Sequence, residues 1–189
     1  ESEIKIRRSR FIAVAAPAVD EQAARIIITQ VAKRFHDSRH VCHAWRLGTP
    51  AAYTENRRDD GEPAGTAGEP ALAEIRKRDL TQTVVVVVRY FGGIKLGTGG
   101  LARAYGQAAG AALDLAPVHT VRLGREFRLE FPYTLQKTIT HLLEQHGGEV
   151  VQETYGADVS WQIWLPNSRW QSLAAKLTEA SAGKIRLRE

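Results

Sequence analysis

The sequence predicts an α+β protein in two parts, residues 1–117 and residues 118–189. The first observation behind this prediction is a run of five valines, Val84 to Val88, which is typical of a central strand buried on both faces. The second is that apolar residues towards the C-terminus recur every two positions in some segments and every 3.6 positions in others. The third is Pro117, which ends a long helical pattern and indicates a boundary between Leu115 and Thr120.

In the N-terminal part, hydrophobic periodicity predicts alternating strands and helices, with Asp20 capping the first helix. We expect Gly106 and Gly110 to let the last helix pack closely against the valine strand. In chain order, the expected elements are a strand over 4–15, a helix to Phe35, a strand over 41–47, a polar loop, a glycine- and acid-rich turn over 59–68, a helix through Arg78, a strand over 83–89, a glycine-rich loop over 91–100 and a helix with Leu115 on its buried face.

In the C-terminal part, the periodicity predicts the order βαββαβ, which is a ferredoxin-like plait. Apolar residues occupy odd positions from Val121 to Phe131, as in a half-buried strand. Pro132 and the pair Gly147-Gly148 delimit the first helix. The remaining elements are expected as strands over 149–154 and 159–165, a helix capped by Asn167 or Ser168, and a strand over 184–188.

The composition indicates a soluble globular protein. Hydrophobic residues make up 43% of the 189 residues, and no apolar run approaches the roughly 20 residues that span a bilayer. We therefore expect no association with a membrane. A single cysteine, Cys42, cannot form an internal disulfide, so we expect the protein to lie in a reducing cytoplasm. The net charge of +5 permits weak attraction to polyanions, and most of it lies in residues 1–117. Because the sequence contains no Met, we expect a short leader before Glu1.

Two glycine-rich segments, Asp59 to Gly68 and Arg89 to Tyr105, each lead into a predicted helix. Glycines let backbone N–H groups approach a ligand, and the first turn of a helix favours an anion such as phosphate. The alternative is a tight strand-to-helix connection whose glycines only permit packing. The segments do not match the standard phosphate-binding motifs. Thr98 stands where a P-loop has its lysine, and no second parallel strand ends in an acidic residue about 20 residues further on, as a dinucleotide-binding fingerprint requires.

These segments resemble the YigZ/IMPACT family, whose hallmarks are a DDGEPxGTAG segment and a valine strand running into RYFGGxKLGxGGLxRAY. Ser9 to Ala13 and His40 to Cys42 also match, so the resemblance covers nearly the whole chain. Ala64 stands where the family frequently has Ser, so a hydroxyl at that position is not essential here.

The resemblance implies a fold and a role in translation. For the N-terminal part it implies the β-α-β arrangement of a ribosomal small-subunit protein and of the translocating elongation factor, and for the tail a plait similar to that factor's C-terminal domain. Eukaryotic IMPACT proteins regulate translation by binding the activator of a starvation-responsive kinase. The implied role is a translation-associated binding protein whose partner is RNA, the ribosome or a translation-related protein.

We expect the acidic turn and the lysine-bearing turn to meet and to line one recessed pocket on a basic surface. The carboxylates could hold Mg²⁺ or act as an acid/base pair, or they could instead satisfy free N–H groups at a helix start. We predict no metal and no cofactor. The candidate ligand-binding residues are Asp59, Asp60, Glu62, Gly65, Thr66, Gly92, Gly93, Lys95, Gly97, Thr98, Gly99, Gly100 and Arg103.

A zinc site or a Cys-His nucleophile among His36, His40, Cys42 and His43 is disfavoured. Side chains alternate along a strand, so Cys42 and His43 would point to opposite faces. The pattern predicts a buried, unreactive Cys42.

Three functions remain open. The first is a non-enzymatic binding module in which basic groups such as Arg7, Arg8 and Arg89 neutralise RNA phosphates while an aromatic residue, Tyr90 or Phe91, stacks on a base. The second is a small enzyme acting on a phosphorylated or nucleotide substrate with the acidic turn and Lys95. The third is a purely protein-binding regulator.

Overall fold

The computed structural model describes residues 1–181 and 185–188, and the chain divides into two compact units, Glu1–Val118 and His119–Glu189. Each unit has its own hydrophobic core. Within the described residues, no helix is long and apolar enough to cross a membrane.

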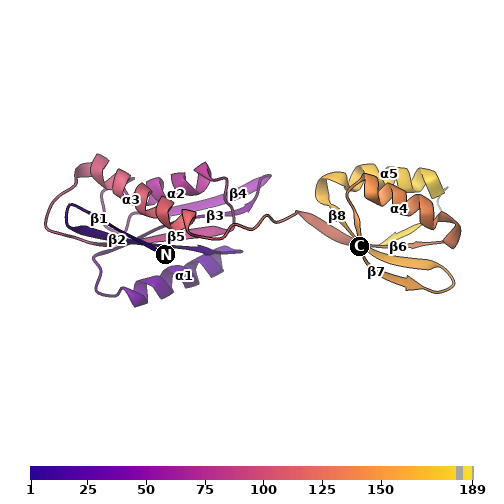
Figure 1. The fold of residues 1–189 in the computed structure, drawn as a ribbon, viewed down its shortest axis with the longest axis horizontal. Helices are drawn as coiled ribbons and strands as arrows, with labels where there is room; N and C mark the ends of the chain where they lie inside the picture. The colour runs from indigo at the N-terminus through magenta and orange to yellow at the C-terminus, as the bar shows by residue number, and fades with distance from the viewer. Residues whose placement is uncertain (182–184, 189) are drawn as a thin grey trace. The chain divides into compact units, whose positions relative to one another are not determined.

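The first unit is a five-stranded sheet covered by helices on both faces (Figure 1). The strand order is β1-β2-β5-β3-β4, and every neighbouring pair is antiparallel. Helix α1 lies on one face, and α2 and α3 lie together on the other (Figure 1). The elements are β1 (Ser2–Ile6), β2 (Ser9–Pro17), α1 (Glu21–Arg34), β3 (His40–Thr49), β4 (Ala52–Arg58), α2 (Gly68–Lys77), β5 (Thr83–Tyr90) and α3 (Gly97–Asp114).

The valine strand is the centre of this unit, as the sequence predicts. All five valines of β5 are fully buried. Val85 and Val87 pack with α2 and α3, whereas Val84, Val86 and Val88 pack with α1. A continuous apolar run therefore marks a strand buried on both faces, although this sheet is antiparallel rather than parallel.

Two of the predicted elements of the first unit are wrong. The single strand expected over 4–15 is a hairpin, because the chain reverses at Arg7 and Arg8, which both have positive φ. The polar loop expected after β3 contains β4, an edge strand paired to β3. An edge strand needs little apolar surface, so the polar sequence of β4 carries no strand signal.

The helices of this unit confirm one prediction and correct two. The carboxylate of Asp20 caps α1 by accepting the Ala23 N–H at 2.7 Å. Leu115 is not on a buried face but 68% exposed, because α3 ends at Asp114. Gly106 and Gly110 face α2 rather than the valine strand: a Cβ at Gly106 would lie 3.7 Å from Pro70.

The second unit is the predicted ferredoxin-like plait. Its sheet has the order β7-β8-β6-β9 with antiparallel neighbours, and α4 and α5 contribute Ile139, Leu143, Leu173 and Leu177 to the core. Lys184, expected to begin the last strand, lies outside the described residues. The elements are β6 (Gly124–Phe131), the short helix η1 (Tyr133–Leu135), α4 (Gln136–Gln145), β7 (Glu149–Tyr155), β8 (Val159–Pro166), the short helix η2 (Asn167–Arg169), α5 (Trp170–Ser181) and β9 (Arg186–Arg188).

The variant Gly106→Ala tests the packing of α3. An added methyl meets Pro70 at an ordinary van der Waals distance, and alanine restricts the unfolded chain, so we expect a gain of about 0.5–1 kcal/mol in the free energy of unfolding. Urea denaturation followed by far-UV circular dichroism measures the gain, and slower hydrogen exchange in α3 locates it. A loss of stability would mean that Gly106 is needed for close packing after all.

Candidate functional site

Asp59 of the acidic turn caps the start of α2. Its Oδ1 accepts the N–H groups of Ala67 and Gly68 at 2.9 and 2.8 Å, and its Oδ2 accepts that of Gly65 at 2.8 Å. Burial acts to raise the pKa of Asp59, but these backbone donors outweigh it and hold the pKa below its usual value. The carboxylate that could have served as a metal ligand therefore satisfies the free N–H groups of a helix start.

Asp60 is likewise bound within the fold. Its Oδ2 accepts the Val41 N–H at 2.8 Å, and its backbone carbonyl oxygen lies 2.8 Å from His40 Nδ1. Its φ is +46°, a left-handed conformation that a non-glycine residue adopts at some cost. Asp60 thus fastens the turn to β3.

Glu62 lies in a buried network that joins the two glycine-rich segments. Its Oε1 accepts a hydrogen bond from Arg89 Nη1 at 2.6 Å and another from the Tyr105 hydroxyl at 2.9 Å. The Glu62 and Arg89 side chains are each only 5% exposed. Ser9 Oγ extends the network by accepting Arg89 Nη2 at 3.3 Å and the Gly92 N–H at 3.2 Å.

Cys42 lies beside this network and is buried, as the sequence predicts. Its thiol donates to the Asp59 carbonyl at 2.9 Å, and burial raises its pKa to about 12. Burial also raises the pKa of the neighbouring Tyr105 hydroxyl. Cys42 is paired with Val87 on the α3 side of the sheet and His43 with Val86 on the α1 side, so the two cannot share a ligand.

The carboxylates of the acidic turn are thus engaged by protein groups. Within residues 1–181 and 185–188, no group of three or more His, Cys, Asp and Glu side chains could hold a metal ion. Thr66 is buried as well, with its hydroxyl donating to the Pro63 carbonyl at 2.6 Å. These contacts favour the interpretation of the turn as a helix cap over that of an acid/base pair.

The middle of the second glycine-rich segment, Arg89 to Tyr105, is exposed to solvent. Helix α3 already begins at Gly97, so Gly97 to Gly100 are its first turn. Its N-cap residue, Leu96, provides no side-chain cap, and no other side chain of the described residues bonds to these amides. Gly97, Thr98 and Gly99 are exposed, and a Cβ at Gly93 or Gly97 would have no neighbour within 4 Å. The first-turn N–H groups of α3 therefore lie open to a ligand.

Two cations flank this open helix start. Lys95 and Arg103 are exposed, and in the part of the chain that the structure describes neither makes a hydrogen bond or an ion pair. A positive charge that no carboxylate neutralises remains available to an anion from solution. Lys95 and Arg103 are thus the charged residues among the predicted site residues that are exposed and unpaired within the described part of the chain.

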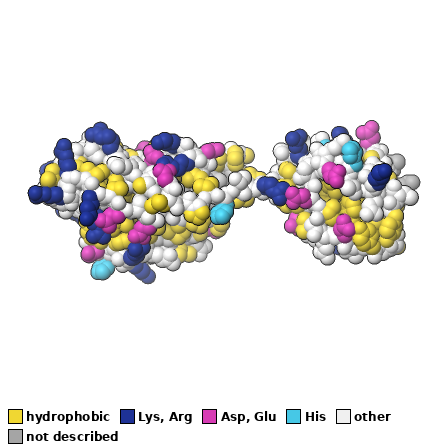
Figure 2. Space-filling view, viewed as in Figure 1, with side chains coloured by type: hydrophobic (Ala, Val, Ile, Leu, Met, Phe, Trp, Pro, Cys, Tyr) yellow, Lys and Arg dark blue, Asp and Glu magenta, His cyan; other side chains and the backbone are white. Residues whose placement is uncertain are grey.

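The turn between β1 and β2 brings two further cations to the same place. A Cβ at Gly92 would lie 2.1 Å from the Arg8 carbonyl carbon, so the Arg7-Arg8 turn packs directly against the second segment. Arg7 and Arg8 are exposed and have φ of 43° and 68°. Figure 2 shows Lys and Arg side chains gathered at this end of the first unit. We call Arg7, Arg8, Lys95 and Arg103 the basic end.

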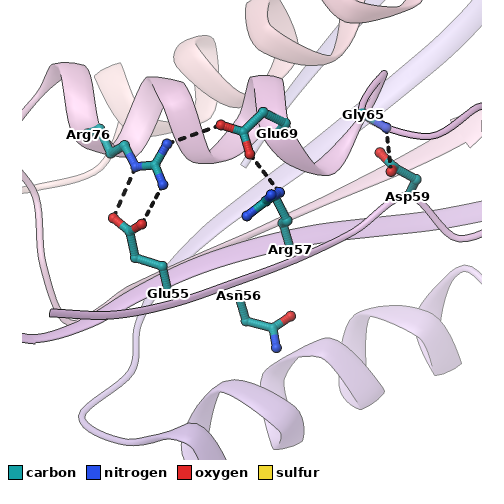
Figure 3. A pocket seen from close by; sticks show the side chains of 7 residues that line it. All are labelled: Glu55, Asn56, Arg57, Asp59, Gly65, Glu69 and Arg76. Atoms are coloured by element: carbon teal, nitrogen blue, oxygen red, sulfur yellow. Dashed lines mark hydrogen bonds and ion pairs between the residues drawn. The ribbon is translucent and has the colours of Figure 1, made fainter.

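A groove beside the acidic turn is separate from the basic end. It encloses about 650 Å³ and lies between β4 and α2. Within it Arg76 pairs with Glu55 and Glu69, and Arg57 pairs with Glu69 (Figure 3). Its lining residues are Glu55, Asn56, Arg57, Asp59, Gly65, Glu69 and Arg76, and none comes from the second segment. The two segments meet through Glu62 and Arg89, not across this groove.

Sequence reasoning misses the buried partners of the site. It places Arg89 among the basic groups for RNA, yet Arg89 is 5% exposed and pairs with Glu62. It also misses the contributions of Ser9 and Tyr105, and only the position of Tyr105 on the apolar face of α3 indicates that it points inward. Pairing across 27 or more residues leaves no local signal.

The comparisons with known proteins agree with this architecture. The Impact N-terminal domain model matches residues 7–113, and a domain of unknown function (DUF1949) matches residues 129–184. The chain belongs to the IMPACT family.

Individual relatives extend over both units. The IMPACT family member YigZ of Escherichia coli K12 is 37% identical over 184 residues, which cover 97% of this chain and 90% of that protein. A crystal structure of a hypothetical protein is 36% identical with a TM-score of 0.67, covering 99% of this chain and 91% of the other. The two-domain translational regulator Yih1 is similar over 58% of this chain and 45% of its own, at 26% identity and a TM-score of 0.39.

The variant Asp59→Asn tests the cap of α2. Asparagine keeps the shape but loses the charge and one acceptor, so we expect a loss of about 1–2 kcal/mol in the free energy of unfolding at pH 7. Hydrogen exchange at Gly65, Ala67 and Gly68 should accelerate, whereas the exposed Glu21→Gln should leave these amides unchanged.

The pH dependence of this loss has a defined sign. Because folding lowers the pKa of Asp59, its carboxylate stabilises the fold fully above the usual Asp pKa of about 3.9, and the contribution is lost as the pH falls further. The gap between wild type and Asp59→Asn should therefore be constant from pH 7 to 5 and narrow below about pH 4. A gap independent of pH would contradict the charged cap.

Proposed function

We propose that this protein is a non-enzymatic binding protein of the translation apparatus, and that its basic end contacts RNA phosphates. Family membership supports the link to translation, since the eukaryotic IMPACT proteins that the sequence resembles are translational regulators. RNA, free or in the ribosome, is the proposed partner.

One observation carries this proposal: an uncapped helix start lies among cations that no protein carboxylate neutralises within the described residues. The first-turn N–H groups of α3 offer donors to a phosphate oxygen. Lys95 and Arg103 flank them, and the Arg7-Arg8 turn packs against Gly92 of the same loop. Several cations on one surface can neutralise successive phosphates of a polyanion.

The backbone conformation of the turn at Arg7 and Arg8 also supports binding at the basic end. A two-residue hairpin with positive φ at both positions strongly prefers Asn-Gly or similar pairs. Here two arginines occupy it at φ of 43° and 68°, a conformation that costs free energy in a non-glycine residue. A binding role for the two guanidinium groups explains why this cost is kept.

The enzymatic alternative has less support. An acid/base mechanism needs a carboxylate that can reach a substrate, whereas Asp59, Asp60 and Glu62 all accept hydrogen bonds from the protein. Exchanging these internal partners for a substrate would uncap α2 or leave the buried Arg89 without its carboxylate.

We propose that the two units act as separate domains, 1–117 and 118–189, of which the first carries the binding surface. That the plait of the second unit is similar to the C-terminal domain of the elongation factor stays a prediction. The outward aromatic residue of this plait, Trp164, has the Arg122 guanidinium 4.6 Å from its ring centroid. Trp164 is only partly exposed, so the second unit offers a base less aromatic surface at this position than an RNA-binding plait does.

Salt-dependent RNA affinity tests the proposal. We expect binding of a single-stranded RNA oligomer to weaken as salt rises, with log K falling linearly against log salt and no turnover of the RNA. The double variant Lys95→Gln/Arg103→Gln should flatten this slope by about 0.7 for each phosphate that it no longer neutralises. Fluorescence anisotropy of a labelled oligomer measures both.

The matched control removes the same charge elsewhere. Lys77→Gln/Lys176→Gln changes one exposed lysine at the end of α2 and one on α5, and its slope should equal that of the wild type. Equal slopes for both double variants would refute the basic end as the binding surface. A translation partner retained after nuclease treatment, with no RNA binding by the pure protein, would favour the protein-binding regulator.

A further inference from the structure

Phe91 is an aromatic residue left exposed at the centre of the basic end. It directly precedes Gly92, which packs against Arg8, and its side chain is 43% exposed. The phenylalanines Phe11, Phe127 and Phe131 are at most 2% exposed. An exposed aromatic side chain is not unusual in itself, but a ring beside unpaired cations offers a phosphate-binding surface a face on which a base can stack.

The neighbouring aromatic, Tyr90, is already engaged. Its hydroxyl donates to Asp37 Oδ1 at 2.7 Å, and the Arg10 guanidinium lies 5.0 Å from its ring centroid. Of the two aromatic residues at the end of β5, Phe91 is therefore the one available to a ligand.

The Phe91 ring rests on a rigid support. The Arg89 guanidinium carbon lies 5.4 Å from the Phe91 ring centroid and 5.4 Å from that of the buried Phe11. Glu62 and Ser9 hold this guanidinium in place through hydrogen bonds. The same guanidinium thus contacts a buried ring and the partly exposed ring of Phe91, which links Phe91 to the core.

Two of the glycines that follow Phe91, Gly93 and Gly97, have free space beside their backbone. A Cβ at Gly93 would meet nothing within 4 Å, and the same holds at Gly97, where α3 begins. Lys95 lies between these two glycines and is exposed. The two glycines thus leave room beside the backbone on either side of the exposed Ile94 and Lys95, and a nucleotide whose base lies on the ring would follow this loop towards Lys95 and the α3 amides.

We propose that Phe91 is a stacking platform for an unpaired base, so that the basic end selects single-stranded over double-stranded RNA. The inference rests on the proposed function, because phosphate contacts bring the strand to the ring. Inside a duplex the bases are stacked on one another and closed to a side chain, whereas unpaired bases stack readily on aromatic rings. Phosphate contacts alone would not distinguish the two forms.

The test compares two RNAs and three variants at one ionic strength. The probes are a labelled 12-nucleotide single strand of mixed sequence and the 12-base-pair duplex containing it, followed by fluorescence anisotropy. We expect the wild type to prefer the single strand and Phe91→Leu to weaken that binding roughly five- to a hundredfold, the usual contribution of one stacked base. Duplex binding should not change.

Two further variants complete the design. Phe91→Trp keeps a platform, so single-strand binding should be retained and the new indole fluorescence should be quenched as the base stacks on it. Tyr133→Leu removes an exposed aromatic residue of the second unit and should change neither affinity. Because Phe91 is exposed, Phe91→Leu should keep the far-UV circular dichroism spectrum of the wild type.

The outcomes separate this inference from the proposed function. If Phe91→Leu weakens neither RNA, or both equally, the stacking platform is refuted, while Lys95→Gln/Arg103→Gln can still show phosphate binding. If neither RNA binds in a salt-dependent way, the proposed function itself fails. If Phe91→Leu instead abolishes nuclease-resistant capture of a protein partner and leaves RNA binding intact, Phe91 belongs to a protein contact and the inference is overturned.

Discussion

The buried ion pair between Glu62 and Arg89 is the interaction on which the arrangement of the first unit depends. It joins a turn at residue 62 to the end of the central strand, and Tyr105 and Ser9 bring α3 and the first hairpin into the same network. Removing one partner of such a pair leaves an uncompensated buried charge and typically costs about 3–5 kcal/mol. The network therefore fixes the surface loops of the first unit relative to one another.

The two glycine-rich segments differ in how the first N–H groups of their helices are satisfied. Both lead into helices whose first N–H groups lack partners within the helix. At α2 the carboxylate of Asp59 supplies the partners, so that helix start has no donors left for an anion. At α3 no side chain of the described residues does so, and the residues of this helix start are exposed beside Lys95. The segment without acidic residues is therefore where we propose binding, and the acidic one supplies rigidity.

Local sequence patterns predicted the elements that are specified locally. The five valines of β5, the Asp20 cap and the alternation in the plait each carry their signal within a few residues. The first hairpin was missed because two arginines occupy a turn that Asn or Gly usually marks, and β4 because an edge strand can be polar. In the candidate site, the helix-start interpretation of Asp59 was available from the sequence. The pairing of Arg89 with Glu62 was not, since only the tertiary fold brings them together.

The distribution of charge matters more here than the net value of +5. Many arginines are neutralised by the protein itself, as in the pairs of Arg57 with Glu69, Arg76 with Glu55 and Arg122 with Glu149. Such surface pairs add little stability, but they remove positive charge that would otherwise attract anions everywhere. Among the described residues, four exposed cations without a carboxylate partner, Arg7, Arg8, Lys95 and Arg103, lie where the hairpin turn meets the start of α3. Others, such as Lys33, Arg39 and Lys176, lie elsewhere on the surface. Charge of this kind attracts any polyanion, so selectivity must come from a group that responds to something other than phosphate. In the proposed function the exposed ring of Phe91 is that group.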